Sequence, residues 1–141
     1  MEKYLGLDLG TTTLGIASSD SLGFVHGVET FRFTKDAYSQ ARKRVIELSN
    51  NLGIKNIVIG LPINMDGTEG FRALSSRRFK EDLENEDPSL KIELQDERMT
   101  SISAHKTLYE LNVKGRNHKE SVDRLAACEI LDFYLKMKGN K

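Results

Sequence analysis

The sequence predicts an α/β domain with a mixed, five-stranded sheet covered by helices on both faces. Near the start of the chain, three apolar or alternating segments follow one another across turn-length gaps, which is typical of hairpin-linked antiparallel strands. After them, helical and extended patterns alternate, as they do when a sheet adds parallel strands. The length of 141 residues indicates one domain that buries roughly two-thirds of its unfolded surface.

Four strands and one helix are expected within the first 60 residues. The strands are indicated by short apolar or alternating runs, such as Ile57-Val58-Ile59. The helix is indicated by apolar residues at helical spacing, and Gly53 follows it as a stop signal. The expected strands are 4–9, 14–19, 27–33 and 56–60, and the expected helix is 36–51.

The remaining residues are expected to form the fifth strand and three more helices. The fifth strand is predicted at 91–97, the helices at 71–83, 101–111 and 120–137, and the loops at 61–70 and 112–119. The helix that starts at residue 71 is expected to bury one side, made of Phe71, Leu74, Phe79 and Leu83. The basic residues at its start are expected to form a solvated face.

The composition is that of an ordinary soluble domain, with 38% hydrophobic and 30% charged residues. The net charge is zero, which gives no global support for nucleic-acid binding. No apolar run approaches the roughly 20 residues that span a membrane, and the first residues lack the plan of a signal peptide. Cys128 is the one cysteine, so no internal disulfide is possible, and we expect a reducing, cytoplasmic location.

Asp8 is a carboxylate inside the apolar strand of residues 4–9. A buried charge costs several kcal/mol unless it is paired or binds a metal. Asp8 is therefore expected to handle a metal ion or a phosphate. The alternative is that it caps a turn and points into water.

Three further carboxylates could join Asp8 from distant parts of the chain. Asp96 and Glu97 end the fifth strand, and alternation does not decide between them because both faces of the sheet are expected to be covered. Asp123 falls in the first turn of the last expected helix, where a carboxylate also gains about 0.3–1 kcal/mol from the helix dipole. Converging carboxylates are the usual protein ligands of Mg²⁺.

At this point the chain resembles the YqgF (RuvX) family, RuvC-like nucleases of the ribonuclease H superfamily. Any one of the matching segments is weak, but the four appear in the family's order and span nearly the whole chain. They are Gly6-Leu7-Asp8-Leu9-Gly10 with Gly15-Ile16-Ala17, Gly60-Leu61-Pro62-Ile63-Asn64-Met65-Asp66-Gly67, Asp96-Glu97-Arg98-Met99-Thr100-Ser101 and Val122-Asp123-Arg124-Leu125-Ala126-Ala127.

The resemblance implies a single three-layer ribonuclease H-like domain over residues 1–141, with strand order 3-2-1-4-5 and the second strand antiparallel. It implies Asp8, Glu97 and Asp123 as catalytic residues and as ligands of Mg²⁺ or Mn²⁺. The implied mechanism uses two metal ions, which hold the attacking and leaving oxygens of a phosphodiester. Asp96 would lie beside this triad and pair with Arg98. Thr11 and Thr12 would also lie beside it, next to Asp8.

The implied substrate is a nucleic acid. Lys114, Arg116 and Lys119 precede Asp123, and a basic loop there would hold phosphates where a strand enters. Arg98 is either a phosphate contact or a plain surface ion pair. Asn64 and Asp66 are expected to shape a turn with Gly67. The histidines His26 and His105 receive no role, and His118 is expected to face solvent.

The resemblance leaves two substrates open. The YqgF family implies maturation of the 5′ end of the 16S ribosomal RNA precursor, whereas RuvC proteins imply Holliday junctions. Junction-resolving RuvC proteins typically carry two acidic residues a turn apart on the last helix, but the position three after Asp123 is Ala126. We therefore favour RNA processing.

Two other functions compete with a nuclease. A nucleic-acid-binding module without catalysis would not depend on the triad. The first hairpin also resembles the phosphate-binding hairpin of actin-like ATPases, but those proteins enclose ATP between two such domains and this chain has the length of one.

Overall fold

The computed structural model describes residues 2–99 and 116–139. It contains one five-stranded sheet in the order β3-β2-β1-β4-β5. The elements are β1 (Tyr4–Leu9), β2 (Thr13–Ser19), β3 (Val25–Arg32), α1 (Tyr38–Leu52), β4 (Asn56–Leu61), α2 (Phe71–Glu86), β5 (Lys91–Asp96), the 3₁₀ turn η1 (Glu97–Met99) and α4 (Arg116–Met137).

The pairing of the strands confirms the predicted mixed sheet. β2 pairs antiparallel with both β1 and β3, whereas β4 pairs parallel with both β1 and β5. The carboxyl ends of β1, β4 and β5 therefore meet at one edge, which is where open α/β sheets place their ligands. We call this the active edge of the sheet.

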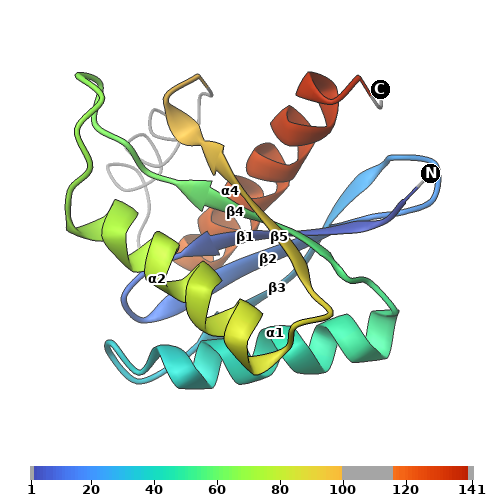
Figure 1. Ribbon diagram of the computed structural model, residues 1–141, viewed down its shortest axis with the longest axis horizontal. Coiled ribbons are helices and arrows are strands. Elements are labelled where there is room, and N and C mark those ends of the chain that lie inside the picture. The colour runs from blue at the N-terminus through green and yellow to red at the C-terminus, as the bar shows by residue number, and fades with distance from the viewer. Residues whose placement is uncertain (1, 100–115, 140–141) are drawn as a thin grey trace.

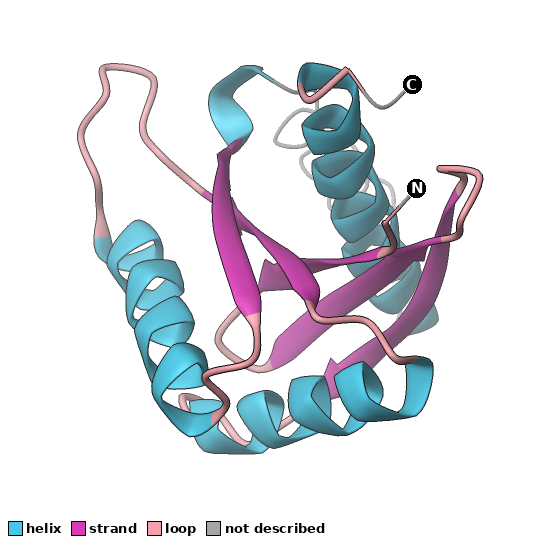
Figure 2. Ribbon diagram, turned by 45° about the vertical axis from the view of Figure 1, so that its right-hand side comes forward, coloured by secondary structure: helices cyan, strands magenta, loops and turns pink. Residues whose placement is uncertain are grey.

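Helices cover both faces of the sheet, as Figures 1 and 2 show: α1 and α2 lie on one side and α4 lies on the other. Side chains of β1 point alternately to the two faces of the sheet. Leu5, Leu7 and Leu9 pack in the core beneath α1 and α2, while Tyr4 packs in the core beneath α4. Even-numbered residues of β1, including Asp8, thus face α4.

The side of α2 that packs on the sheet differs from the expected one. Phe79 and Leu83 are buried as predicted, but Phe71 is 66% exposed and Leu74 is 59% exposed. Their places on the buried side are taken by Ala73 and Ser76. The prediction followed hydrophobicity, whereas the helix orients by the spacing of Ser76, Phe79 and Leu83, which share one face.

The last helix begins earlier than predicted. Residues 116–119 were expected to lie in a loop, but α4 starts at Arg116. Polarity alone does not end a helix, and Arg, Lys and Glu are good helix formers. The predicted helix at 101–111 and the first part of the predicted loop, with Lys114 and His105, lie outside the described residues. None of the helices within residues 2–99 and 116–139 is both long and apolar enough to cross a membrane.

Candidate functional site

Asp8 is a buried carboxylate near the active edge, and only 6% of it is exposed. The β1–β2 register pairs Asp8 with Gly15, and the β1–β4 register, which matches Leu7 with Ile59, brings Gly60 to its other side. Residues aligned across neighbouring strands present their side chains on the same face. Asp8 therefore stands between two glycines on the face that α4 covers.

The space above these two glycines is occupied by the other two predicted acidic residues together with Ile130 of α4. A Cβ atom at Gly15 would lie 2.1 Å from the carbonyl oxygen of Asp123 and 3.3 Å from its Cβ. A Cβ atom at Gly60 would lie 2.5 Å from Cδ1 of Ile130 and 3.1 Å from the carboxylate carbon of Glu97. The two glycines form a cradle on either side of Asp8, which admits the backbone of Asp123 over Gly15 and the side chains of Glu97 and Ile130 over Gly60.

Asp123 is held on the side of α4 that packs on the sheet. It is 6% exposed, and Ala126, Ala127 and Ile130 continue the same buried side of the helix. Asp123 follows Arg116 by seven residues, or about two turns, so the predicted position in the first turn is wrong. The helix dipole acts mainly within the first turn and does not explain this carboxylate.

The structure separates Asp96 from Glu97, which alternation could not. β5 ends at Asp96, and the 3₁₀ turn η1 begins at Glu97, which is only 7% exposed. Asp96 instead accepts hydrogen bonds from Arg98, at 2.8 Å from the backbone nitrogen, 3.0 Å from Nε and 2.8 Å from Nη2. These bonds lower the pKa of Asp96 below its usual value. The predicted Asp96–Arg98 pair is therefore present, and Glu97 is the residue that turns inward.

The family model that matches this chain covers residues 2–137 and is described as "RuvX: Holliday junction resolvase". The chain belongs to the RuvX family. A relative from Geobacillus sp. (strain WCH70), named "Putative pre-16S rRNA nuclease", is 41% identical over 137 residues, which is 96% of this chain and 99% of the relative. A relative of the same name from Acetivibrio thermocellus is 37% identical over 138 residues, 97% of each chain.

Two solved structures show that this RuvX-family fold is RuvC-like. RuvC of Thermus thermophilus aligns with a TM-score of 0.59 at 13% identity, over 98% of this chain and 97% of RuvC. The yeast mitochondrial Holliday junction resolvase Ydc2 aligns with a TM-score of 0.56 at 10% identity, over 99% of this chain and 80% of Ydc2. At these identities the likeness is one of fold, and it confirms the predicted ribonuclease H-like sheet.

The loop after β4 lies against Arg98 in this RuvX-family chain. Asp66 accepts hydrogen bonds from the backbone nitrogen of Thr68 at 2.9 Å and from its hydroxyl at 2.6 Å. Gly67 has a φ of 90°, and a Cβ atom there would lie 3.5 Å from Nη1 of Arg98. Asn64 closes the same turn by donating to the Thr68 hydroxyl at 2.9 Å. The predicted turn therefore forms, and its tip lies beside the Asp96–Arg98 pair.

The turn between β1 and β2 is fixed through its backbone. The carbonyl of Thr11 accepts a hydrogen bond from Asp36, and the carbonyl of Thr12 accepts one from Phe33, both at 2.9 Å. Gly10 donates to the carbonyl of Thr13 at 2.8 Å. Thr11 and Thr12 thus tie the turn that follows Asp8 to the segment after β3, and their side chains are half-buried.

The basic residues predicted near Asp123 divide between two parts of the chain. Lys114 lies outside the described residues, and Arg116 and Lys119 fall in the first turns of α4, together with His118. His26 is far from the active edge, because it is the second residue of β3, which begins at the other end of the sheet, and it pairs with Asp20 at 3.3 Å.

Arg72 is a residue near the site that sequence reasoning missed. Its Nη2 donates a 2.8 Å hydrogen bond to the carbonyl oxygen of Leu9, one residue after Asp8. Helical spacing could have indicated it, because Arg72 precedes Ser76 by four residues and Phe79 by seven and so shares their face of α2.

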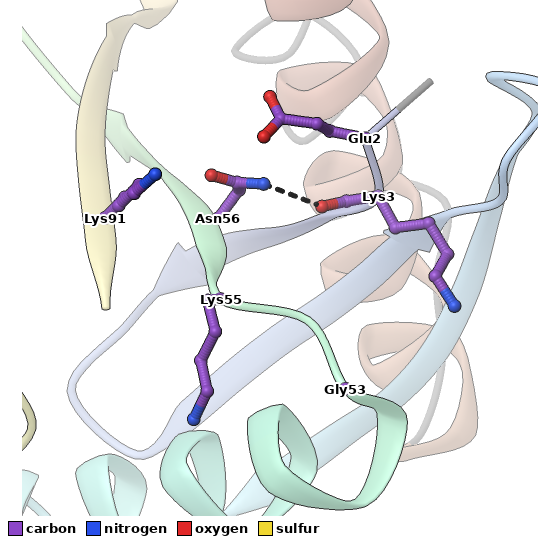
Figure 3. Close-up of a pocket in the computed structure, with 6 residues that line it drawn as sticks. All are labelled: Glu2, Lys3, Gly53, Lys55, Asn56 and Lys91. Atoms are coloured by element: carbon purple, nitrogen blue, oxygen red, sulfur yellow. Dashed lines mark hydrogen bonds between the residues drawn. The ribbon is translucent and has the colours of Figure 1, made fainter. Parts of the chain in front are cut away.

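Figure 3 shows a pocket at the opposite edge of the sheet, near the amino ends of β1, β4 and β5. Asn56 donates there to the carbonyl of Lys3 at 3.3 Å. The charged side chains of Glu2, Lys3 and Lys55 point in different directions, so they do not form a common binding point. The pocket does not contribute to the carboxylate site.

Proposed function

We propose that this chain is a metal-dependent phosphodiester hydrolase that processes the 5′ end of the 16S ribosomal RNA precursor. The carrying observation is the burial of Asp8, Glu97 and Asp123 around the Gly15–Gly60 cradle. Family membership and the name of relatives up to 41% identical over nearly the full chain support the substrate.

The donor set fits a hard divalent cation. Asp8, Glu97 and Asp123 offer oxygen atoms from three separate elements, and carboxylates are the usual protein ligands of Mg²⁺ and Mn²⁺. Within residues 2–99 and 116–139, no three acidic, histidine or cysteine side chains already have the spacing of a metal site. Coordination would therefore require the three carboxylates to move closer together at the cradle.

The chemistry that bound Mg²⁺ or Mn²⁺ supplies is activation of water and stabilisation of the leaving oxygen of a phosphodiester. The elements of the fold position the three carboxylates that would hold the metal. β1 fixes Asp8 in the sheet, η1 turns Glu97 inward, and the middle of α4 carries Asp123. We assign phosphate binding to Lys114, Arg116, Lys119 and Arg98, and we propose that Asp96 keeps the Arg98 guanidinium beside the site.

A second candidate substrate is the four-way DNA junction. It is favoured by the description of the family model, "Holliday junction resolvase". Against it stands Ala126, which occupies the place one turn after Asp123 where junction-resolving RuvC proteins carry a second acid. Ala126 is 3% exposed, so this position packs on the sheet and offers no carboxylate.

The test is to incubate the wild-type chain with a ribosomal RNA precursor and with a four-way DNA junction, with and without Mg²⁺ or Mn²⁺. We expect cleavage of the RNA that requires the metal. Asp8→Asn, Glu97→Gln and Asp123→Asn should each abolish it while the circular dichroism spectrum stays unchanged. Asp132→Asn is the matched control, because Asp132 is on the same helix but pairs with Lys136 at 3.0 Å.

Each outcome decides between the functions. Cleavage of RNA by Asp8→Asn at the wild-type rate contradicts the proposed site. Cleavage of the junction without cleavage of the RNA replaces the proposed substrate. Tight binding of either probe with no cleavage under any metal identifies a binding module.

A further inference from the structure

Arg72 brings a guanidinium group to the active edge of the sheet. It is the second residue of α2 and is exposed, and helical spacing places it on the same side of the helix as the buried Ser76 and Phe79. Its Nη2 atom donates to the carbonyl oxygen of Leu9 at 2.8 Å. Leu9 ends the strand that carries Asp8, so the cation is anchored one residue from a predicted catalytic carboxylate.

The end of β1 explains why a side chain can reach this carbonyl. The pairs between β1 and β4 run from Tyr4 with Asn56 to Leu7 with Ile59, so Leu9 lies past the ladder. Beyond β4, Pro62 has no backbone N–H to offer. Arg72 thus extends the hydrogen bonding of β1 at the point where the neighbouring strand stops.

The charge of Arg72 is not neutralised in the way that other arginines are. In the part of the chain that the structure describes, ion pairs with carboxylates hold Arg42, Arg44, Arg77, Arg78 and Arg98. The hydrogen bond of Arg72 goes to a neutral carbonyl, which uses one of the five N–H donors of a guanidinium. The first turn of α2 also has no acidic residue, and a cation there gains nothing from the helix dipole.

We propose that Arg72 binds a backbone phosphate of the nucleic-acid strand beside Asp8, through the guanidinium donors that Leu9 leaves available. A planar guanidinium suits this task because it can hold a phosphate with two parallel hydrogen bonds. The hydrogen bond to the Leu9 carbonyl holds the Arg72 guanidinium at the carboxyl end of β1. A phosphate bound to it would therefore lie at the same end of the strand as Asp8. This assignment rests on the proposed function, because it takes the ligand to be the same nucleic acid.

The test measures binding separately from cleavage. A single-stranded fragment of the ribosomal RNA precursor is titrated with wild type, Arg72→Gln, Arg72→Lys and Arg78→Gln in a Ca²⁺ buffer, over a series of salt concentrations. Arg78 is the matched control, because it lies on the same helix, its side chain is 76% exposed, and it pairs with Asp82. Melting temperatures of all four proteins are recorded.

We expect Arg72→Gln to weaken binding about tenfold, as for the loss of one charge-assisted phosphate contact. The slope of log K against log salt should fall by about 1. Arg72→Lys should keep the salt slope and lose part of the affinity, and Arg78→Gln should match wild type in both.

The inference is overturned if Arg72→Gln binds with wild-type affinity and salt slope, or if it changes only the melting temperature, as a purely structural clamp would. It is also overturned if wild type binds none of the RNA. Cleavage in Mg²⁺ or Mn²⁺ is scored separately. A chain that binds RNA through Arg72 but never cuts it refutes the proposed nuclease and leaves the phosphate contact standing.

Discussion

Replacing Gly15 with alanine should push α4 away from the sheet. The added Cβ would lie 2.1 Å from the carbonyl oxygen of Asp123 and 2.6 Å from its carbonyl carbon. Both atoms belong to helix backbone and cannot rotate aside. Ordinary contact begins near 3.4 Å, so the helix must retreat by about 1.3 Å at Asp123.

The cost follows from the packing that this retreat disturbs. Ala126, Ala127 and Ile130 of α4 are almost fully buried between this helix and the sheet, and overpacking of such a core costs typically 1–3 kcal/mol. We expect the upper end, about 3 kcal/mol, because the obstacle is backbone. For a chain of this length that corresponds to a fall in Tm of roughly 10 °C.

Gly27→Ala is the matched control for this substitution. Gly27 lies in β3 beneath the same helix, but a Cβ atom there would meet Arg124 Cβ at 3.6 Å and Cys128 Sγ at 3.8 Å, which is ordinary contact. Neither glycine has a positive φ, so both substitutions are equally acceptable to the backbone. Gly27→Ala should be neutral or stabilising by about 0.4–1 kcal/mol, through the unfolded state.

The assay is thermal unfolding followed by circular dichroism, with urea unfolding as a second measurement. A Gly15→Ala protein that melts at the temperature of Gly27→Ala would refute the close approach of Asp123 to β2. A crystal structure of Gly15→Ala with α4 in its original place would refute it as well.

Two further predictions concern pH. Burial and the hydrogen bond to Glu93 raise the pKa of Tyr134 from 10 to about 12, so this group contributes stability that is complete below pH 10 and lost between about pH 10 and 12. Urea unfolding at pH 9 and pH 11 should show wild type losing roughly 1 kcal/mol more than Tyr134→Phe, since pH 11 lies midway between the two pKa values; equal losses would contradict it. The hydrogen bonds from Arg98 lower the pKa of Asp96, so the pair contributes stability above the ordinary pKa of 3.8 that is lost as pH falls further. Carboxyl titration by NMR should find the Asp96 pKa higher in Arg98→Gln than in wild type, and an unchanged value would show that another group sets it.

Much of the fold could be predicted because it depends on local patterns. Local sequence patterns alone predict several elements. Examples are the hairpin spacing of the first three strands, the apolar run of β4 and the helical repeat of α1. The motif residues likewise placed Asp8 and Asp123 on elements that the structure keeps. Errors arose where a local pattern was ambiguous, as at the exposed Phe71 and Leu74 of α2.

The sequence by itself determined the order of the elements, the strand that carries Asp8 and the family of the chain. Hydrophobic periodicity and short motifs depend only on residues that are near one another in the sequence. The alternation pattern left Asp96 and Glu97 undecided, the family resemblance favoured Glu97, and the tertiary structure shows that Glu97 is the buried one. Only the tertiary structure decided that Asp123 sits two turns into α4 and that Arg72 reaches the end of β1. Alternation cannot choose a direction when both faces of a sheet are covered. How closely two elements approach depends on the side chains between them. Gly15 and Gly60 have no side chain, so the backbone of α4 at Asp123 and the side chains of Ile130 and Glu97 can come close to the sheet beside Asp8.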